Sequence, residues 1–259
     1  MGYICREPSA ENWGEAKDKS MRAVVLQPTY LPWMGYFGMI DIADVFVFYD
    51  DVQFSVQSWQ QRNKIKSMNG NWMWLSIPII RNFGQTIKEV QINNATDWQK
   101  KHWASIYQSY AKTAYFKDYK EEMENIYESE WEYLCDLNIS VIKKVAGLLS
   151  VRMPQFIKSS ELEDISGDKT DKLLLILKKI GADEYISGPA AKEYMEGDKL
   201  EQRGIKLYWY EYQHPVYPQI RGEFIPYLSA IDLLFNTGSE ALKYIREGSK
   251  DALKRAVRD

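Results

Sequence analysis

The chain has 259 residues, 45% of them hydrophobic and 27% charged, so it is long enough to bury a sizeable core and is predicted to be globular. Its formal net charge of −3 provides no general basic field for capturing nucleic acid, and its two cysteines are too few for a disulfide framework. No apolar run approaches the roughly 20 residues of a membrane helix, and no cysteine or histidine spacing suggests zinc. We therefore expect a cytoplasmic protein without a metal site and without a membrane or nucleic-acid partner.

The first twenty residues differ from the rest of the chain. They carry no hydrophobic periodicity and no signal-peptide core, and Met21 immediately precedes the first credible strand. We therefore predict a flexible extension over 1–20 followed by a single α/β domain over 21–259.

The domain alternates strand and helix patterns. Residues 22–27 are a short apolar run typical of a buried strand, 34–43 have helical apolar spacing, and 45–49 return to a strand. Such a unit implies a right-handed crossover and parallel pairing. Further strands are predicted at 71–79, 87–92, 183–188 and 205–213. Further helices are predicted at 98–112, at 119–149 as one helix or two, at 168–181 and around 229–235. The predicted fold class is a Rossmann-like α/β fold with a mainly parallel sheet flanked by helices and a helical insertion at about 95–150.

A proline-rich elbow follows the first strand. Its two prolines fix φ angles where the chain leaves the sheet, and glycines early in the next helix permit close approach of a ligand or a strand. The elbow either forms a binding wall or plugs the end of the sheet, and its own residues leave both alternatives open. Its candidate binding residues are Gln27, Pro28, Tyr30, Trp33 and Tyr36.

Two acids and a polar loop follow the strand at 45–49. Asp50 and Asp51 stand at its carboxyl end, where paired acids can bind ribose hydroxyls, an amine or a divalent ion, or simply cap a turn. The loop at 53–66 is predicted to be a recognition surface in which cations bind a phosphate or pyrophosphate. Alternatively, Arg62 pairs with Asp50 or Asp51 and fastens the loop. The candidate residues of the loop are Gln53, Trp59, Arg62, Asn63 and Lys64.

The later candidates lie at strand ends or on helices. His214 follows the last predicted strand and is a candidate general base, whereas His102 on an amphipathic helix is expected to be structural. Ser187 and Gly188 end another strand, where backbone amides suit an anion or a simple helix cap. Asp232 and Asn236 lie one helical turn apart on an apolar helix, where they form either a structural tie, which we expect, or a reach into the site.

Five motifs in order carry a resemblance to a known family: QPTYLPWMGYF, ADVFVFYDDVQFS, WQQRNKIK, YISGPAAKEY and LSAIDLLFNTG. Over roughly residues 21–240, the chain closely resembles the WbqC-like protein family. The resemblance implies a bacterial, cytoplasmic role in polysaccharide or O-antigen biosynthesis, where an activated sugar is made or decorated.

The leading functional hypothesis is a transferase that modifies a nucleotide-linked sugar, most concretely by acyl or aminoacyl transfer to a sugar amine from a carrier-bound donor. Asp50, Asp51 or His214 would accept the amine proton, and Arg62 and Lys64 would hold a pyrophosphate. The sequence identifies no cofactor.

Two other functions stay open. The elbow also resembles the phosphate-gripping segment of adenylate-forming and nucleotidyl-transferring enzymes of the HIGH-type superfamily, although Trp33 and Tyr36 stand roughly where those enzymes have histidines. The third alternative is a non-catalytic ligand-binding protein of polysaccharide assembly.

Overall fold

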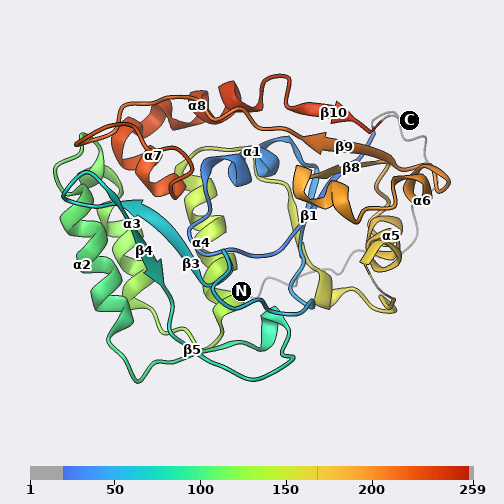
Figure 1. The fold of residues 1–259 in the computed structure, drawn as a ribbon, viewed down its shortest axis with the longest axis horizontal. Coiled ribbons are helices and arrows are strands. Elements are labelled where there is room, and N and C mark those ends of the chain that lie inside the picture. Colours follow the sequence, from blue (N-terminus) through green and yellow to red (C-terminus); the bar gives the residue numbers. More distant parts are fainter. Residues whose placement is uncertain (1–19, 168, 257–259) are drawn as a thin grey trace, which may run out of the picture.

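The computed structural model describes residues 20–167 and 169–256, so the predicted extension over 1–20 lies almost wholly outside the described residues. A six-stranded sheet forms the centre, with strand order β10-β9-β8-β1-β2-β7 (Figure 1). All neighbouring strands pair in parallel except β10, which is antiparallel to β9. The strands are β1 (Arg22–Leu26), β2 (Val45–Phe48), β7 (Gln155–Lys158), β8 (Glu184–Ser187), β9 (Lys206–Tyr210) and β10 (Leu253–Arg255).

Successive strands are added to the sheet first on one side of β1 and then on the other. From β1 the chain moves outward through β2 to β7 at one edge, then returns to place β8 on the other side of β1 and continues through β9 to β10. The loops after β1 and β8 therefore leave the same edge of the sheet at the point where this direction reverses. The fold is a mixed α/β fold with a mostly parallel central sheet.

Helices cover both faces of the sheet, as the alternation of side chains along β1 requires. Val24 packs in a core that includes α1 (Met34–Ile42) and α8 (Ala241–Ser249), whereas Ala23 and Val25 pack in a second core with α5 (Lys169–Lys179) and α6 (Gly197–Glu201). Gly38 of α1 permits close approach to β9, because a Cβ there would lie 2.2 Å from the Tyr210 hydroxyl oxygen. Among the described residues, no helix is both long and apolar enough to cross a membrane.

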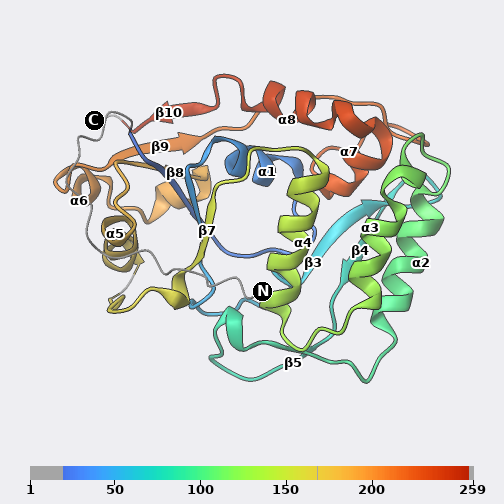
Figure 2. The same ribbon diagram turned by 180° about the vertical axis from the view of Figure 1, so that it is seen from behind.

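The segment between β2 and β7 forms the end of the molecule that lies farthest from α5 and α6. It contains two small antiparallel pairs followed by three helices, and Figures 1 and 2 show α2 and α3 at one end of the long axis with α5 and α6 at the other. The elements are β3 (Arg62–Lys66), β4 (Trp72–Ser76), β5 (Ile79–Ile80), η1 (Ile87–Glu89), β6 (Gln91–Ile92), α2 (Trp98–Tyr110), α3 (Phe116–Glu128) and α4 (Leu134–Leu148).

Several predicted elements require correction. The loop predicted at 53–66 ends in strand β3, whose alternating burial depends on pairing with β4. The strand predicted at 71–79 is divided into β4 and β5, and the one predicted at 87–92 begins as the 3₁₀ turn η1. The remaining elements are η2 (Ser159–Glu161), η3 (Pro189–Glu193), α7 (Ala230–Thr237) and η4 (Gly238–Glu240).

Candidate functional site

The elbow after β1 is held in a bent conformation by distant backbone and side-chain contacts. Leu31 has a φ of 44°, a left-handed conformation that a leucine rarely adopts. The Asn63 side-chain amide donates to the carbonyl oxygens of Tyr30 (3.2 Å) and Leu31 (2.7 Å), and the Tyr30 backbone amide donates to the Trp59 carbonyl (2.9 Å). These contacts over-determine the bend, which is how backbone strain persists in folded proteins.

The elbow forms one wall of an aromatic pocket with a volume of about 270 Å³. The predicted binding residues Trp33, Tyr36, Trp59 and Asn63 all line this pocket, and Tyr227 closes it from a distant loop. Gly35 lets the Trp33 ring lie over the start of α1, because a Cβ at this position would come within 2.2 Å of that ring. The complete lining is Thr29, Pro32, Trp33, Tyr36, Trp59, Asn63 and Tyr227.

His214 supports this pocket from behind. Its Nε2 accepts a hydrogen bond from the Tyr227 backbone amide (3.1 Å), so the neutral ring carries its proton on Nδ1 and donates it to the Pro215 carbonyl (2.9 Å). Burial lowers the pKa of His214, which favours this neutral form. Both ring nitrogens are therefore occupied, and the contact holds Tyr227, whose φ is 58°, against the pocket.

A surface of tryptophans and cations adjoins the aromatic pocket on the β3–β4 hairpin. The Arg62 guanidinium carbon lies 4.2 Å from the centre of the Trp74 ring, and Lys64 Nζ lies 4.3 Å from that of Trp72. Trp59 packs at 5.6 Å from Trp74, so the pocket and this surface share one side chain. We call Trp59, Arg62, Lys64, Trp72 and Trp74 the tryptophan platform.

The two cations of the tryptophan platform have no acidic partner among the described residues. The hypothesis that Arg62 pairs with Asp50 or Asp51 is therefore wrong for this structure. Asp51 instead pairs with Lys172 Nζ at 2.8 Å. The Arg62 Nε is buried without a hydrogen-bond partner.

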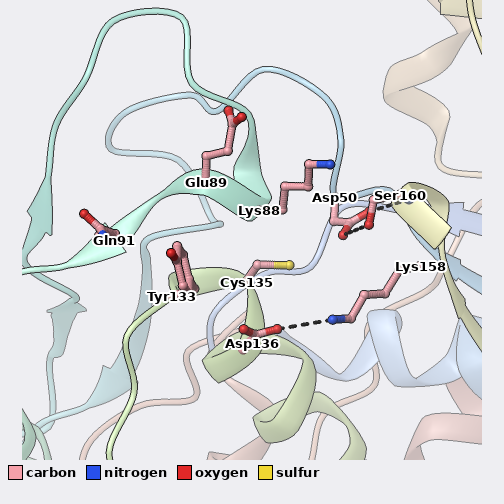
Figure 3. Close-up of a pocket in the computed structure, with 9 residues that line it drawn as sticks. All are labelled: Asp50, Lys88, Glu89, Gln91, Tyr133, Cys135, Asp136, Lys158 and Ser160. Atoms are coloured by element: carbon pink, nitrogen blue, oxygen red, sulfur yellow. Dashed lines mark hydrogen bonds and ion pairs between the residues drawn. The ribbon is translucent and has the colours of Figure 1, made fainter.

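A second, polar pocket of about 500 Å³ lies at the carboxyl ends of β2 and β7 (Figure 3). Asp50 lines it and is 1% exposed. Its carboxylate accepts hydrogen bonds from the Ser160 amide (3.0 Å) and hydroxyl (2.7 Å). The Ser159 hydroxyl lies within hydrogen-bond distance of both Asp50 (3.0 Å) and Asp51 (2.5 Å) and can donate its single proton to only one of them at a time. The complete lining is Asp50, Lys88, Glu89, Gln91, Tyr133, Cys135, Asp136, Lys158 and Ser160.

The ionisation of the groups beside this pocket follows from their surroundings. Burial alone would raise the pKa of Asp51, but hydrogen bonds from Lys172 and Ser159 bring the pKa below its ordinary value. Burial raises the pKa of the Cys135 thiol to about 12, and the charges of Asp50 and Asp136 add to this effect. Asp51 is thus an ionised partner of Lys172, and Cys135 is a neutral thiol rather than an activated nucleophile.

Other predicted site residues connect to neighbouring segments. Gln27 accepts from the Gln60 side-chain amide (2.8 Å), the Pro28 carbonyl accepts from the Asn138 side-chain amide, and Gln53 forms an isolated β-bridge with Thr86. The Tyr30 ring is fully buried, with its hydroxyl bonded to Tyr127 and His102. It supports the elbow from within.

Ser187 is the last residue of β8 and Gly188 follows it, and neither lines the aromatic or the polar pocket. Ser187 is 3% exposed, and its hydroxyl accepts from the Tyr185 hydroxyl. The described part of the chain contains no group of three or more His, Cys, Asp or Glu side chains arranged to hold a metal ion.

The long loop between β9 and α7, which contains Tyr227, is held in place by a buried polar network. Asp232 is fully buried and accepts from the hydroxyls of Tyr110 (2.9 Å) and Tyr217 (2.8 Å) and from the Gln219 side chain (2.9 Å). Lys66 Nζ donates to the Gln219 side-chain oxygen (3.0 Å). The expected structural tie at Asp232 is confirmed, and it includes loop residues that the sequence pattern did not connect to it.

Comparison with known proteins agrees with the family resemblance of the sequence. A model of the WbqC-like protein family matches residues 27–244. An uncharacterized protein of Mycobacterium tuberculosis (strain ATCC 25618 / H37Rv), Rv1507c, is 32% identical over 228 residues, which is 87% of this chain and 97% of that protein. No solved structure matches the chain. The chain therefore belongs to the WbqC-like protein family.

Proposed function

We propose that the protein is a transferase that acts on a nucleotide-linked sugar, with acyl or aminoacyl transfer to a sugar amine as its reaction. The observation that carries this proposal is the continuity of the aromatic pocket with the tryptophan platform through Trp59. Trp59 is 51% exposed and Trp72 is 46% exposed. Exposed aromatic rings beside unpaired cations are suited to a ligand that combines rings with phosphates.

In this proposal the two surfaces divide the ligand between them. A base or sugar ring packs among Trp33, Tyr36 and Trp59, where apolar side chains surround it. The diphosphate lies on the platform, where the Arg62 fork can take two phosphate oxygens and Lys64 supplies a point charge. Cations already stacked on tryptophan rings are ordered before the ligand binds, which reduces the entropy lost on binding.

The path of the chain through the sheet supports this placement. Numbered along the chain from β1, the strands of the sheet have the order 3-2-1-4-5-6, with the last strand reversed. This order supports the proposal of a Rossmann-like fold. In open α/β sheets, ligands bind outside the carboxyl ends of the strands, near the point where the direction of the chain reverses. The elbow after β1 stands at that point.

The proposed chemistry depends mainly on binding and orientation. His214 has both nitrogens engaged, and Asp51 is ion-paired, so neither is poised as a strong base. We assign His214 to positioning Tyr227 and Asp51 to its ion pair with Lys172, and we retain Asp50 as the proposed proton acceptor. Holding the amine and an activated donor together supplies most of the rate enhancement in this proposal.

The same proposal places the reaction in bacterial polysaccharide or O-antigen biosynthesis in the cytoplasm, with a carrier-bound acyl or aminoacyl donor. Family membership supports this setting. Adenylate formation gains no support from the elbow, because Trp33 and Tyr36 offer no cation to a developing phosphate charge.

Calorimetric titration with a panel of nucleotide-linked amino sugars tests the proposal. Arg62→Lys should weaken binding by about 1–3 kcal/mol, because the planar fork is lost while the charge is kept. Trp59→Ala should weaken binding by about 1 kcal/mol or more. The matched controls, Arg81→Lys and Phe83→Ala, alter exposed residues outside both pockets and should leave affinity unchanged.

The outcomes separate the functional classes. Tight binding with no turnover for any acyl or aminoacyl donor would identify a non-catalytic binding protein. Magnesium-dependent release of pyrophosphate would identify an adenylate-forming or nucleotidyl-transferring enzyme. If no nucleotide-linked sugar binds, or if the platform variants bind as well as their controls, the proposal is refuted.

A further inference from the structure

One segment of the chain differs from the rest in its charge. Residues 52–88 contain no aspartate or glutamate but five lysines and arginines, whereas the whole chain has 36 acids against 33 of these cations. The net charge of −3 therefore conceals a basic region, and the expectation of no membrane partner rests on that average. The five cations are Arg62, Lys64, Lys66, Arg81 and Lys88.

Three of these cations are available to a partner. Lys66 is buried, and its amine donates to Gln219 and to a backbone carbonyl. Lys88 lies beside Glu89, whose charge offsets it. The remaining three, Arg62, Lys64 and Arg81, form no ion pair with any acid in the described part of the chain.

The same segment carries exposed apolar side chains. Among the described residues, twelve large hydrophobic side chains are exposed, and six of them lie within 52–88. Phe83 is as exposed as it would be in an extended peptide, at 104%. Apolar side chains gathered in this way indicate a surface that a partner covers. The six are Val56, Trp59, Met68, Trp72, Ile80 and Phe83.

Two loops of the segment lie side by side outside the proposed ligand site. Residues 53–58 contact residues 80–86, because the Phe54 amide donates to the Gln85 carbonyl (3.0 Å). Neither loop lines the aromatic or the polar pocket. The strand β5, where the second loop begins, lies at the rim of the molecule in both views (Figures 1 and 2). The loops can therefore meet a large, flat partner.

We propose that this segment binds the surface of an anionic lipid bilayer. Val56, Ile80 and Phe83 insert among the lipid headgroups, where apolar side chains leave water and neighbouring cations stay solvated. Arg81, on the same loop as Phe83, lies near the lipid phosphates. A nucleic acid fits this surface less well, because aliphatic side chains do not stack on bases as aromatic rings do.

Co-sedimentation of the full chain with lipid vesicles tests this proposal. Vesicles of phosphatidylglycerol and phosphatidylcholine in equal parts should bind the protein about tenfold or more tightly than vesicles of phosphatidylcholine alone. Phe83→Ala should weaken binding to the anionic vesicles about fivefold or more, because a large apolar side chain no longer leaves water. Arg81→Gln should weaken it about fivefold, because one cation near the phosphates is lost.

The matched controls are Leu175→Ala and Lys178→Gln. Both alter exposed residues of α5, at the other end of the long axis, and both variants should bind the anionic vesicles as the wild type does (Figure 1).

Four results would overturn the proposal. They are no binding to the anionic vesicles, equal binding to both kinds of vesicle, wild-type binding by Phe83→Ala, and wild-type binding by Arg81→Gln. Binding of a single-stranded oligonucleotide without binding of vesicles would instead assign the segment to nucleic acid. The proposed function is tested separately, because Phe83→Ala should keep its affinity for the nucleotide-linked sugar in the lipid-free titration.

Discussion

Replacement of Asp232 by asparagine should change how the stability of the protein depends on pH. Burial raises the pKa of the Asp232 carboxyl from 3.8 to about 6, although hydrogen bonds from Tyr217 and Tyr110 and the charge of Lys66 oppose this rise. The folded protein therefore holds the proton more tightly than the unfolded chain does. The stability that this proton contributes is fully present below pH 3.8 and is lost as the pH rises to about 6.

The size of the effect follows from the two pKa values. A rise from 3.8 to about 6 corresponds to roughly 3 kcal/mol, and because part of this lies below pH 4, roughly 2–3 kcal/mol should be lost between pH 4 and pH 7. The side-chain amide of the Asp232→Asn variant cannot ionise. Between pH 4 and pH 7, the unfolding free energy of the variant should therefore rise by roughly 2–3 kcal/mol relative to that of the wild type, whatever the stability of the variant at pH 4.

Urea denaturation of both proteins between pH 4 and pH 7, followed by tryptophan fluorescence, measures the difference. His102 and His214 are present in both proteins, so their own titration cancels in the comparison to first order. Asp118→Asn, a change at an exposed acid of α3, is the control and should run nearly parallel to the wild type. If Asp232→Asn also runs parallel to it, the carboxyl does not titrate in this range and the reasoning is wrong.

Two further predictions concern contacts beside the pockets. His214→Ala should weaken binding of a nucleotide-linked sugar about tenfold or less in a calorimetric titration, because the Tyr227 amide loses its acceptor; unchanged affinity would show that Tyr227 needs no such support. Lys172→Met should lower the unfolding free energy by about 1–3 kcal/mol at neutral pH, because Asp51 is left without its 2.8 Å partner. Since the pKa of Asp51 is lowered, this loss should fade as acid protonates the carboxyl, and a loss independent of pH would contradict the assignment.

The elements nearest the start of the sheet could be predicted because local signals agreed there. The apolar run before Gln27, the fixed prolines and the helical spacing after Trp33 all indicated strand, elbow and helix, and β1, the bend and α1 follow in that order. The pocket residues Trp33, Tyr36, Trp59 and Asn63 lie in the two segments that sequence reasoning selected.

Other elements depended on contacts that a local pattern does not contain. The edge strand β7 pairs only with β2, so its side chains are only partly buried and its sequence, QFIK, shows no strong alternation. The helix α8 did carry a usable signal, since Ala241, Ile245 and Gly248 are buried at helical spacing. Tyr227 had none, because its place in the aromatic pocket depends on the distant His214 and on the loop network around Asp232.

Residue type and strand-end position were insufficient to assign roles to the acids and the histidine. Asp50 and His214 do follow strands, as predicted, but their partners decide what they can do. Ser159 and Ser160 occupy the Asp50 carboxylate, and Tyr227 and Pro215 occupy the His214 ring. Most of these partners lie far away in the sequence, so no helical or strand periodicity predicts the contacts.

The helix α4 contacts both pockets: its first turn lines the polar pocket, and Asn138 binds the backbone beside the aromatic pocket. Cys135 and Asp136 at its start line the polar pocket. Two residues after Asp136, the fully buried Asn138 donates its side-chain amide to the carbonyls of Pro28 (3.2 Å) and Gln60 (2.8 Å), in the segments that build the aromatic pocket. A rigid helix with about 1.5 Å rise per residue thus sets the spacing between the pockets.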